Sequence, residues 1–361
     1  MAREAIASAW PVRLEPLARI RDRLLAAPPL APAPIPLADA GGAILAAPLR
    51  LLADLPAADE ALRDGWAVAA LDTVGASPYA PAVVPAAPVR AGAPLPPGCD
   101  AVVPASAARE IAGLLTVETA VAPGDEVRRR GFDGRAGTAI ASGGSPLDAT
   151  TLAVARLAGL RDVAVRRPRV RLDASGPLAD LLAATVAAAG ATVVPDAEQV
   201  DLRLVATEAE IPAHPLARAA LAEGRLLAGG LALTGAEAVA VAETDAAPLL
   251  LIPARLDAVW LVAHALVAPL LARLAGCHGE APAVTRPLAR KLVSRVGFAE
   301  LALLVPDEAG RWLPLATGTL PAAALARAEA VVELPAESEG LPEGAPLAAH
   351  PLIRALRGVL A

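Results

Sequence analysis

With 361 residues, the chain is too long for one ordinary hydrophobic core, so we expect two to four domains. A net charge of −6 and an aromatic content of 2% argue against a nucleic-acid-binding surface. Cys99 and Cys277 lie too far apart for a disulfide framework or a metal cluster, which fits a reducing cytoplasm. The start of the chain carries an early acid and no apolar run, so we expect a cytoplasmic protein without a signal peptide.

The first part of the chain predicts a helix, a connector and then β structure. Leucine and isoleucine recur at helical spacing within the first thirty residues. The proline-rich run at 28–36 predicts an extended connector. Short apolar alternations rich in valine and proline between 69 and 121 predict a small β domain.

The second part predicts an amphipathic helix at 150–160, ended by Gly159, and then an α/β domain. Alternating strands and helices predict a mostly parallel sheet whose ligand site lies beyond the carboxyl ends of its strands. The most apolar stretch, at 258–271, is shorter than the roughly 20 residues that span a bilayer, so we expect a buried core helix and no membrane contact. The expected strands are at 169–172, 192–195, 202–206 and 249–253, the expected helices at 178–190, 216–223 and 256–274, and the expected strands of a final β module at 300–305, 312–315 and 330–334.

Three aspartates are candidate site residues. Asp64 precedes a glycine, which suits a tight turn that turns the carboxylate outward; Asp100 lies at the mouth of a short strand, and Asp133 follows three consecutive arginines. Asp64 and Asp100 also have a structural interpretation, as an Asp-Gly turn and a capping aspartate, respectively. The alternative for each of the arginines at 128–130 is a solvated basic strand end. The four histidines share no metal-ligand spacing with one another or with the cysteines.

Four collinear segments carry a family resemblance. Residues 89–103 read Val-Arg-Ala-Gly-Ala-Pro-Leu-Pro-Pro-Gly-Cys-Asp-Ala-Val-Val, and the others are at 54–68, 124–134 and 167–170. Together they resemble the motifs of the molybdopterin molybdenumtransferases, the MoeA and gephyrin E-domain family. The resemblance implies an elongated multidomain protein of α/β and β class, and a short helix at 37–45 that leads into the first domain. The implied parts are a discontinuous linker domain (1–50 and 141–168), an inserted β lid (51–140), an α/β molybdopterin-binding-type domain (169–282) and a C-terminal β-barrel-like domain (283–361).

The resemblance also implies an activity. The family joins molybdate to adenylated molybdopterin with the help of Mg²⁺ and works as a homodimer. Carboxylate oxygens suit a hard cation, and guanidinium groups suit oxyanions. The implied catalytic residues are Asp64, Asp100 and Asp133, with Asp64 and Asp133 also as metal ligands, and the implied cofactor-binding residues are Arg128, Arg129, Arg130, Ser175, Gly176 and Arg255.

Several positions depart from the family pattern. Ser175-Gly176-Pro177-Leu178 stands in place of Thr-Gly-Asp-Glu, and a loop with Glu208 and Glu210 stands in place of a glycine-rich phosphate loop. Arg255 is a candidate replacement for lost positive charge. We therefore expect a molybdenum cofactor transferase that is impaired. The alternative is a non-catalytic molybdopterin-binding or partner protein that serves delivery to, or regulation of, a molybdoenzyme.

Overall fold

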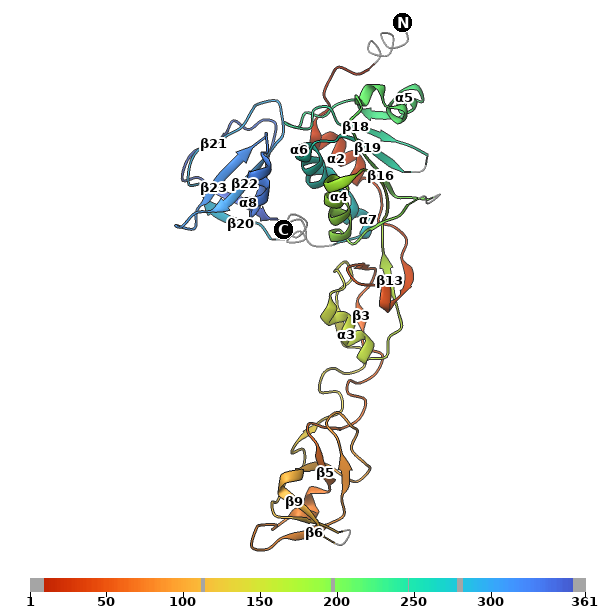
Figure 1. Ribbon diagram of the computed structural model, residues 1–361, viewed down its shortest axis with the longest axis vertical. Coiled ribbons are helices and arrows are strands. Elements are labelled where there is room, and N and C mark those ends of the chain that lie inside the picture. Colours follow the sequence, from red (N-terminus) through yellow and green to blue (C-terminus); the bar gives the residue numbers. More distant parts are fainter. Residues whose placement is uncertain (1–9, 112–113, 196–198, 246, 278–281, 353–361) are drawn as a thin grey trace.

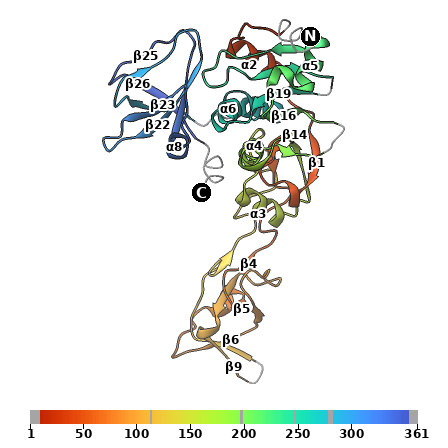
Figure 2. The same ribbon diagram turned by 45° about the horizontal axis from the view of Figure 1, so that its top comes forward.

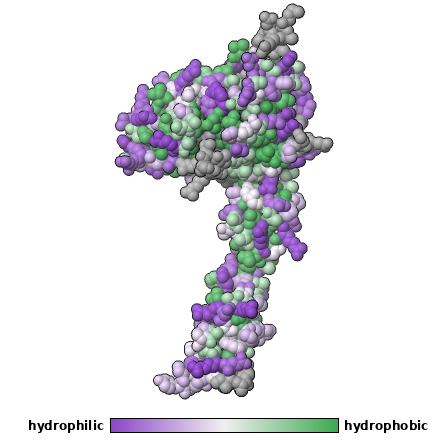
Figure 3. All heavy atoms as spheres, in the orientation of Figure 1, coloured by the Kyte–Doolittle hydropathy of each residue, from purple (hydrophilic) through white to green (hydrophobic). Residues whose placement is uncertain are grey.

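The computed structural model describes residues 10–111, 114–195, 199–245, 247–277 and 282–352. The molecule is elongated: a broad head carries the α/β and C-terminal parts, and a narrow neck joins it to a β unit at the far end (Figure 1). The space-filling view shows the same wide head on a thin column, with hydrophilic and hydrophobic side chains interspersed (Figure 3). The expected multidomain α/β and β fold is confirmed.

The neck forms where the chain leaves the head and where it returns. The proline-rich run is more than a connector, because β1 (Ala33–Pro36) pairs with β13 (Asp162–Arg166) at a sheet edge, where a missing N–H costs nothing. The short helix expected at 37–45 is wrong: a single 3₁₀ turn, η1 (Leu37–Asp39), gives way to a turn with Gly42 at φ 72° and then to a strand. The other neck elements are β2 (Ile44–Leu45), β3 (Leu49–Arg50), β12 (Ala139–Ala141) and α3 (Ala149–Leu157).

The far unit, residues 51–138, is called the lid below. Its small core gathers short apolar strands, and Val68, Val103 and Val117 are fully buried there. Three small antiparallel sheets build it, in the orders β4-β11, β7-β5-β8 and β6-β10-β9. The elements are β4 (Glu60–Ala61), β5 (Gly65–Val68), η2 (Ala70–Thr73), β6 (Ala82–Val84), β7 (Ala87–Val89), β8 (Ala101–Pro104), η3 (Ala105–Ala107), β9 (Ala108–Ile111), β10 (Leu114–Val117) and β11 (Val127–Arg128).

The head contains a six-stranded sheet of order β15-β14-β16-β19-β18-β17. The first four strands are parallel, as expected. The sequence did not predict β18 and β17; β18 runs antiparallel to β19, and β17 runs antiparallel to β18. One face is covered by α4, by α6 to α7 and by α2, whereas α5 covers only part of the other face. The elements are α2 (Leu17–Leu25), β14 (Arg169–Asp173), α4 (Gly176–Ala188), β15 (Thr192–Val193), β16 (Leu202–Thr207), η4 (Ile211–Ala213), α5 (Pro215–Ala222), β17 (Leu226–Ala228), β18 (Ala240–Glu243) and β19 (Pro248–Pro253).

The expected apolar helix runs from α6 (Leu256–Val262) through a π-helical turn, η5 (Ala263–Val267), into α7 (Ala268–Ala275). The π turn stands just before Pro269, which lacks an N–H for the regular α ladder. Among the described residues, this is the one helix long and apolar enough to cross a membrane. Its most apolar window is 72% buried and packs against the sheet, so it is a core helix, as the sequence predicts.

The C-terminal part is an antiparallel five-stranded sheet with a small two-stranded partner. It packs on the α/β part: Leu301 and Leu303 join the main core, and the Arg21 guanidinium on α2 donates to both carboxylate oxygens of Glu333 at 2.5 and 2.9 Å. The elements are β20 (Val284–Pro287), β21 (Leu292–Val293), β22 (Glu300–Pro306), β23 (Trp312–Thr317), α8 (Ala322–Arg327), β24 (Ala330–Leu334), β25 (Gly340–Leu341) and β26 (Pro346–Pro351).

Candidate functional site

Asp64 lies on the lid surface in the loop between β4 and β5. Its Oδ1 accepts a hydrogen bond of 2.9 Å from the backbone N–H of Ala91, so the carboxylate holds the start of the proline-rich loop. Gly65 has a different role from the turn expected for it. A Cβ at this position would lie 2.3 Å from the carbonyl oxygen of Val103, so glycine is needed for close strand packing. Asp64 is exposed, and a backbone hydrogen bond holds one of its carboxylate oxygens.

Asp100 has a structural environment. Its Oδ1 accepts a hydrogen bond of 2.8 Å from the N–H of Ala70 at the start of η2. Its own backbone N–H donates to Val68, and its carbonyl accepts from Gly124. The half-buried Asp100 side chain caps this turn, in agreement with the interpretation of Asp100 as a capping aspartate.

Asp133 pairs with the first of the three arginines. The Arg128 guanidinium donates to Asp133 Oδ1 and lies over the Phe132 ring, with its central carbon 5.4 Å from the ring centroid. The Arg128 Nε is buried and makes no hydrogen bond. Arg128 is thus held by a carboxylate and an aromatic ring at the lid surface.

The other two arginines each have a carboxylate partner that the sequence analysis missed. Arg129 donates to Asp59 at 2.9 Å, and Arg130 donates to Asp54 at 2.8 Å. The backbone N–H of Arg130 also donates to Asp59, and that of Ala136 donates to Asp54. These backbone bonds, more than the guanidinium groups, hold the pKa of both carboxyls below its usual range. The signal available in the sequence was two aspartates shortly before the Asp64 motif.

The described lid does not offer Mg²⁺ a shared site on Asp64 and Asp133. The two short strands β4 and β11 pair antiparallel, with Ala61 opposite Val127. Asp64 follows one strand and Asp133 the other, so they lie at opposite ends of this ribbon. Asp133 is also committed to Arg128. Among the described residues, no three His, Cys, Asp or Glu side chains group together as a metal site.

Ser175 and Gly176 lie in the head, at the carboxyl end of β14. Ser175 is the N-cap residue of α4 but donates or accepts no capping hydrogen bond through its side chain. Gly176 has φ 57°, and a Cβ there would meet open space. Since β15 lies on one side of β14 and β16 on the other, this point is where the strand order reverses. In open α/β sheets, ligands bind at such an edge, and helix N-termini favour anions.

Arg255 lies at the same edge, as the N-cap residue of α6 after β19. Its guanidinium donates to both oxygens of Asp257, at 2.5 and 3.2 Å, and these bonds raise the pKa of Arg255. Glu237, missed by the sequence analysis, adds to this negative surrounding and accepts from the N–H of Gly235. The positive charge of Arg255 is therefore partly neutralised by Asp257 and Glu237.

The loop after β16 completes this edge. Glu208 and Glu210 are both exposed there, ahead of the short turn η4. His214 closes the loop by accepting a hydrogen bond from the N–H of Leu216 at 3.3 Å, so it caps α5 as a structural residue. The edge thus combines two helix N-termini with two exposed carboxylates.

The predicted site residues fall into two groups that a single chain does not bring together. Asp64, Asp100, Asp133 and the arginine run 128–130 belong to the lid, and Ser175, Gly176 and Arg255 belong to the head. Two views 45° apart both place the strands of the lid, β5, β6 and β9, at the far end of the molecule from α4 and β16 (Figures 1 and 2).

Comparisons with known proteins match this architecture. A family model described as the MoeA N-terminal region (domain I and II) matches residues 14–159. "Molybdopterin molybdenumtransferase 2" of Mycobacterium tuberculosis (strain CDC 1551 / Oshkosh) is 32% identical over 47% of this chain and 51% of that protein. "Molybdopterin molybdenumtransferase" of Synechococcus elongatus is 29% identical over 38% of this chain and 39% of that protein. These matches show distant homology to the MoeA family, with the family model confined to residues 14–159.

Solved structures extend the likeness of fold to 94% of the chain. A molybdopterin biosynthesis MoeA protein from Pyrococcus horikoshii has a TM-score of 0.65 at 21% identity and covers 94% of this chain and 99% of its own. A molybdenum cofactor biosynthesis protein from Pyrococcus furiosus has a TM-score of 0.55 at 17% identity. The sequence matches to the two curated relatives named above span about half or less of their lengths. The MoeA family model includes the lid aspartates, whereas Ser175, Gly176 and Arg255 lie beyond it.

Proposed function

We propose that this chain acts in molybdenum cofactor biosynthesis by inserting molybdate into adenylated molybdopterin. The observation that carries the proposal is the carboxyl edge of the parallel sheet, where α4 begins at the strand reversal after β14 and α6 begins after β19, two strands away. Backbone N–H groups at helix N-termini bind phosphate without a side chain, and the pterin substrate is a phosphate ester. Gly176 leaves open space for that phosphate.

In this proposal the lid supplies the groups that face the molybdate. The arginines at 128–130 offer guanidinium forks to an oxyanion, and Asp64 and Asp133 offer carboxylates to accept or hold protons. Since Asp133, Asp59 and Asp54 already pair with these arginines, molybdate competes with a carboxylate for each guanidinium group. That competition supports a slower reaction than in a relative whose arginines are free, and so supports the expected impairment. Because the lid carboxylates fit no common Mg²⁺ site, we route no step through the ion.

We further propose that the working form is a cytoplasmic homodimer. The lid and head groups lie at opposite ends of one chain, so one active centre needs the lid of one copy beside the head of another (Figures 1 and 2). A two-fold dimer supplies two such centres from identical surfaces.

The second candidate is a non-catalytic molybdopterin-binding protein that hands the cofactor to a molybdoenzyme. Two observations favour it over an efficient enzyme: every arginine of the lid run is paired with a carboxylate, and Glu208 and Glu210 are exposed in the loop that follows β16, at the carboxyl edge of the sheet. Such a protein would bind molybdopterin at the carboxyl edge of the head sheet, and its lid residues would catalyse no reaction.

Mixing two variants separates the two candidates. Asp64→Ala disables the lid, and Gly176→Asp places a charge at the head edge, so each variant alone should lose molybdate insertion. In an equal mixture, about half of the dimers contain one chain of each variant. Each mixed dimer has one intact centre of two, made from the lid of the Gly176→Asp chain and the head of the Asp64→Ala chain. We therefore expect about one quarter of the unaltered activity. Molybdenum content of the pterin product is the readout. If the unaltered protein is active and the mixture of variants is not, the two chains do not share an active centre. No activity in the unaltered protein, with molybdopterin binding intact, favours the second candidate.

A further inference from the structure

The turn before β11 holds Glu126 in a conformation that side chains rarely adopt. Glu126 has φ 57°, and in the part of the chain that the structure describes it is the one non-glycine residue with a positive φ. Hydrogen bonds on both sides enforce the turn: Asp125 Oδ2 accepts from the N–H of Ala122 at 2.7 Å, and the N–H of Val127 donates to the carbonyl of Gly124. A left-handed conformation disfavours a residue with a Cβ by about five- to thirtyfold.

The side chain of Glu126 pairs with Arg63 across the end of the β4–β11 ribbon. Glu126 Oε2 lies 2.8 Å from Arg63 Nε, and the N–H of Leu62 donates to the Glu126 carbonyl at 2.8 Å. The two paired side chains are 54% and 30% exposed, and such an ion pair favours folding by about fivefold at most. The pair therefore does not offset the left-handed backbone, which glycine or asparagine would adopt more easily. Residues held in this way cluster at functional sites.

Arg63 directly precedes Asp64, and the loop that carries both is fixed. The N–H of Ala91 holds Asp64 Oδ1, and Glu126 holds Arg63 from the Nε side. Among the described residues, the two Nη groups of Arg63 have no hydrogen-bond partner, and no acid other than Glu126 forms an ion pair with this guanidinium. The outer edge of the guanidinium therefore remains open to a ligand.

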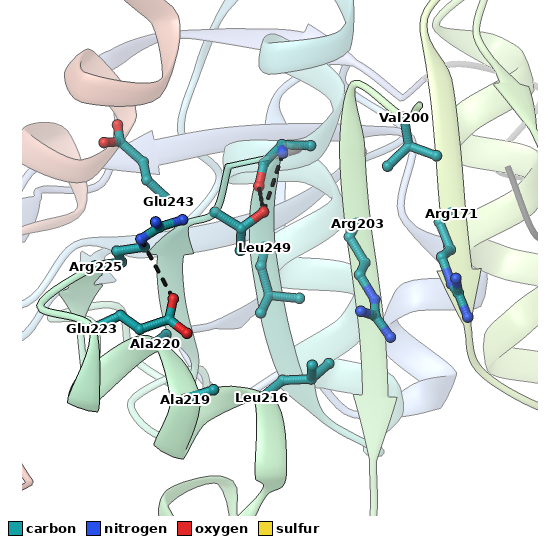
Figure 4. Close-up of a pocket in the computed structure, with 12 residues that line it drawn as sticks. Arg171, Val200, Arg203, Leu216, Ala219, Ala220, Glu223, Arg225, Glu243 and Leu249 are labelled. Atoms are coloured by element: carbon teal, nitrogen blue, oxygen red, sulfur yellow. Dashed lines mark hydrogen bonds and ion pairs between the residues drawn. The ribbon is translucent and has the colours of Figure 1, made fainter. Parts of the chain in front are cut away.

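Other arginines near the candidate sites are more fully paired. Each arginine of the run 128–130 has a carboxylate partner. In the head, a cavity of about 340 Å³ lies between α5 and the sheet, with Arg203 and Glu223 on opposite sides (Figure 4). Arg203 donates to Asp173 through both Nε and Nη2. Arg63 differs from these groups because its carboxylate contacts the Nε side and leaves the fork of Nη groups open.

We propose that Glu126 is a positioning residue that holds the Arg63 guanidinium beside Asp64, and that Arg63 binds molybdate through its Nη groups. This inference rests on the proposed function, in which the lid faces molybdate. The planar fork of Nη donors suits two oxygens of a tetrahedral oxyanion. The negative charge of Glu126 opposes an anion nearby, so the orientation that it gives to Arg63 has to outweigh this repulsion. These opposite signs separate a positioning role from a simple charge effect.

The test is titration calorimetry of the full chain with sodium molybdate at constant ionic strength. We expect saturable binding that Arg63→Gln weakens by about tenfold or more, since the fork is lost. Arg109→Gln is the matched control and should leave the affinity unchanged. Arg109 is also an exposed lid arginine paired with a glutamate, Glu118 at 3.6 Å, but it lies on β9, at the far end of the lid from β4 (Figure 2).

Glu126→Asn tests the positioning role. Asparagine tolerates the left-handed conformation and removes the charge, so the variant should be at least as stable as the unaltered chain in urea unfolding. Its molybdate binding should nevertheless be at least about threefold weaker, because Arg63 is no longer held. The double variant with Arg63→Gln should bind no more weakly than Arg63→Gln alone, because Glu126 acts through Arg63.

The proposal is overturned if molybdate does not bind saturably at millimolar concentration, or if Arg63→Gln has no larger effect than Arg109→Gln. Unchanged or tighter binding in Glu126→Asn overturns the positioning role. Molybdopterin binding and molybdate insertion are measured separately. A chain that binds molybdate through Arg63 but inserts none supports this inference and contradicts the proposed activity. Insertion at an unchanged rate in Arg63→Gln contradicts this inference alone.

Discussion

At the scale of single residues, glycines set the position of the candidate groups as much as the charged side chains do. Asp64 is placed by its bond to Ala91 and by Gly65, whose missing Cβ lets β5 approach Val103. We predict that Gly65→Ala destabilises the protein by about 2 kcal/mol, because the added methyl overlaps the Val103 carbonyl. Thermal unfolding measures this. Gly41→Ala is the control, since its Cβ would meet only Leu152 at 3.8 Å; equal losses in the two variants would contradict the packing account.

His264 makes stability depend on pH. Its ring stacks on Trp260 with centroids 5.1 Å apart, and burial, aided by nearby His350 and opposed by Glu333, lowers its pKa from 6.5 to about 4. Between pH 6.5 and about 4, His264 is therefore protonated in the unfolded chain and neutral in the folded chain. Stability is complete above pH 6.5 and falls as the pH drops toward 4, by about 1 to 3 kcal/mol.

Urea unfolding between pH 7 and 5 measures this dependence, in a window above the titration of the aspartates with lowered pKa. His264→Phe keeps an aromatic ring on Trp260 and removes the proton, so its stability should be flatter over this window. An unchanged slope in His264→Phe would show that another group carries the dependence.

The sequence was informative about which side chains are candidates and silent about their partners. Gly159 as a helix stop follows from local chemistry, and the structure has it at φ 76°. Asp100 does cap a turn, but that turn begins at Ala70, 30 positions away, so the local pattern did not identify its partner. The pairing of Arg129 with Asp59 joins residues 70 positions apart, and no local pattern encodes it. Gly65 was expected to make a turn, but a contact with a strand distant in sequence gives the reason for glycine.

At the scale of elements, the loop after β16 is the feature with the largest expected effect on ligand affinity. Glu208 and Glu210 are exposed beside the N-terminal ends that we propose bind phosphate. We predict that changing both to glutamine tightens molybdopterin binding at least about fivefold, since close like charges cost about 1 kcal/mol or more each. Glu308→Gln, in an exposed loop of the C-terminal part, should have no effect. Unchanged affinity in the double variant would mean that this loop does not face the phosphate.

Elements with strong apolar runs were predictable, and alanine- and proline-rich ones were not. The helices expected at 178–190, 216–223 and 256–274 and the strands expected at 202–206 and 249–253 are all present to within two residues. Strands β17 and β18 were missed because alanine gives little strand signal, and tertiary packing decides their conformation. Proline at 34 and 36 argued against a strand, but β1 is an edge strand and pairs through its remaining groups.

At the scale of the whole molecule, the separation of lid and head is the fact that sequence could not supply. Motif order gave the parts, but only the structure shows the lid aspartates and the head edge at opposite ends (Figures 1 and 2). We predict a homodimer, because one chain leaves each half of the proposed centre incomplete. Light scattering at micromolar concentration should give about twice the chain mass of 36.2 kDa. A monomer mass at every concentration would contradict the shared centre.

The central claim is that the carboxyl edge of the head sheet holds the phosphate of molybdopterin. Gly176 allows a charge-specific test, because asparagine and aspartate both tolerate its φ of 57° and differ by one negative charge.

The deciding measurement is the dissociation constant of molybdopterin for the unaltered chain, Gly176→Asn and Gly176→Asp, compared side by side. We predict saturable binding to the unaltered chain and binding at least about fivefold weaker in Gly176→Asp than in Gly176→Asn. Absence of saturable binding to the unaltered chain, or equal affinity in the two variants, would contradict the claim.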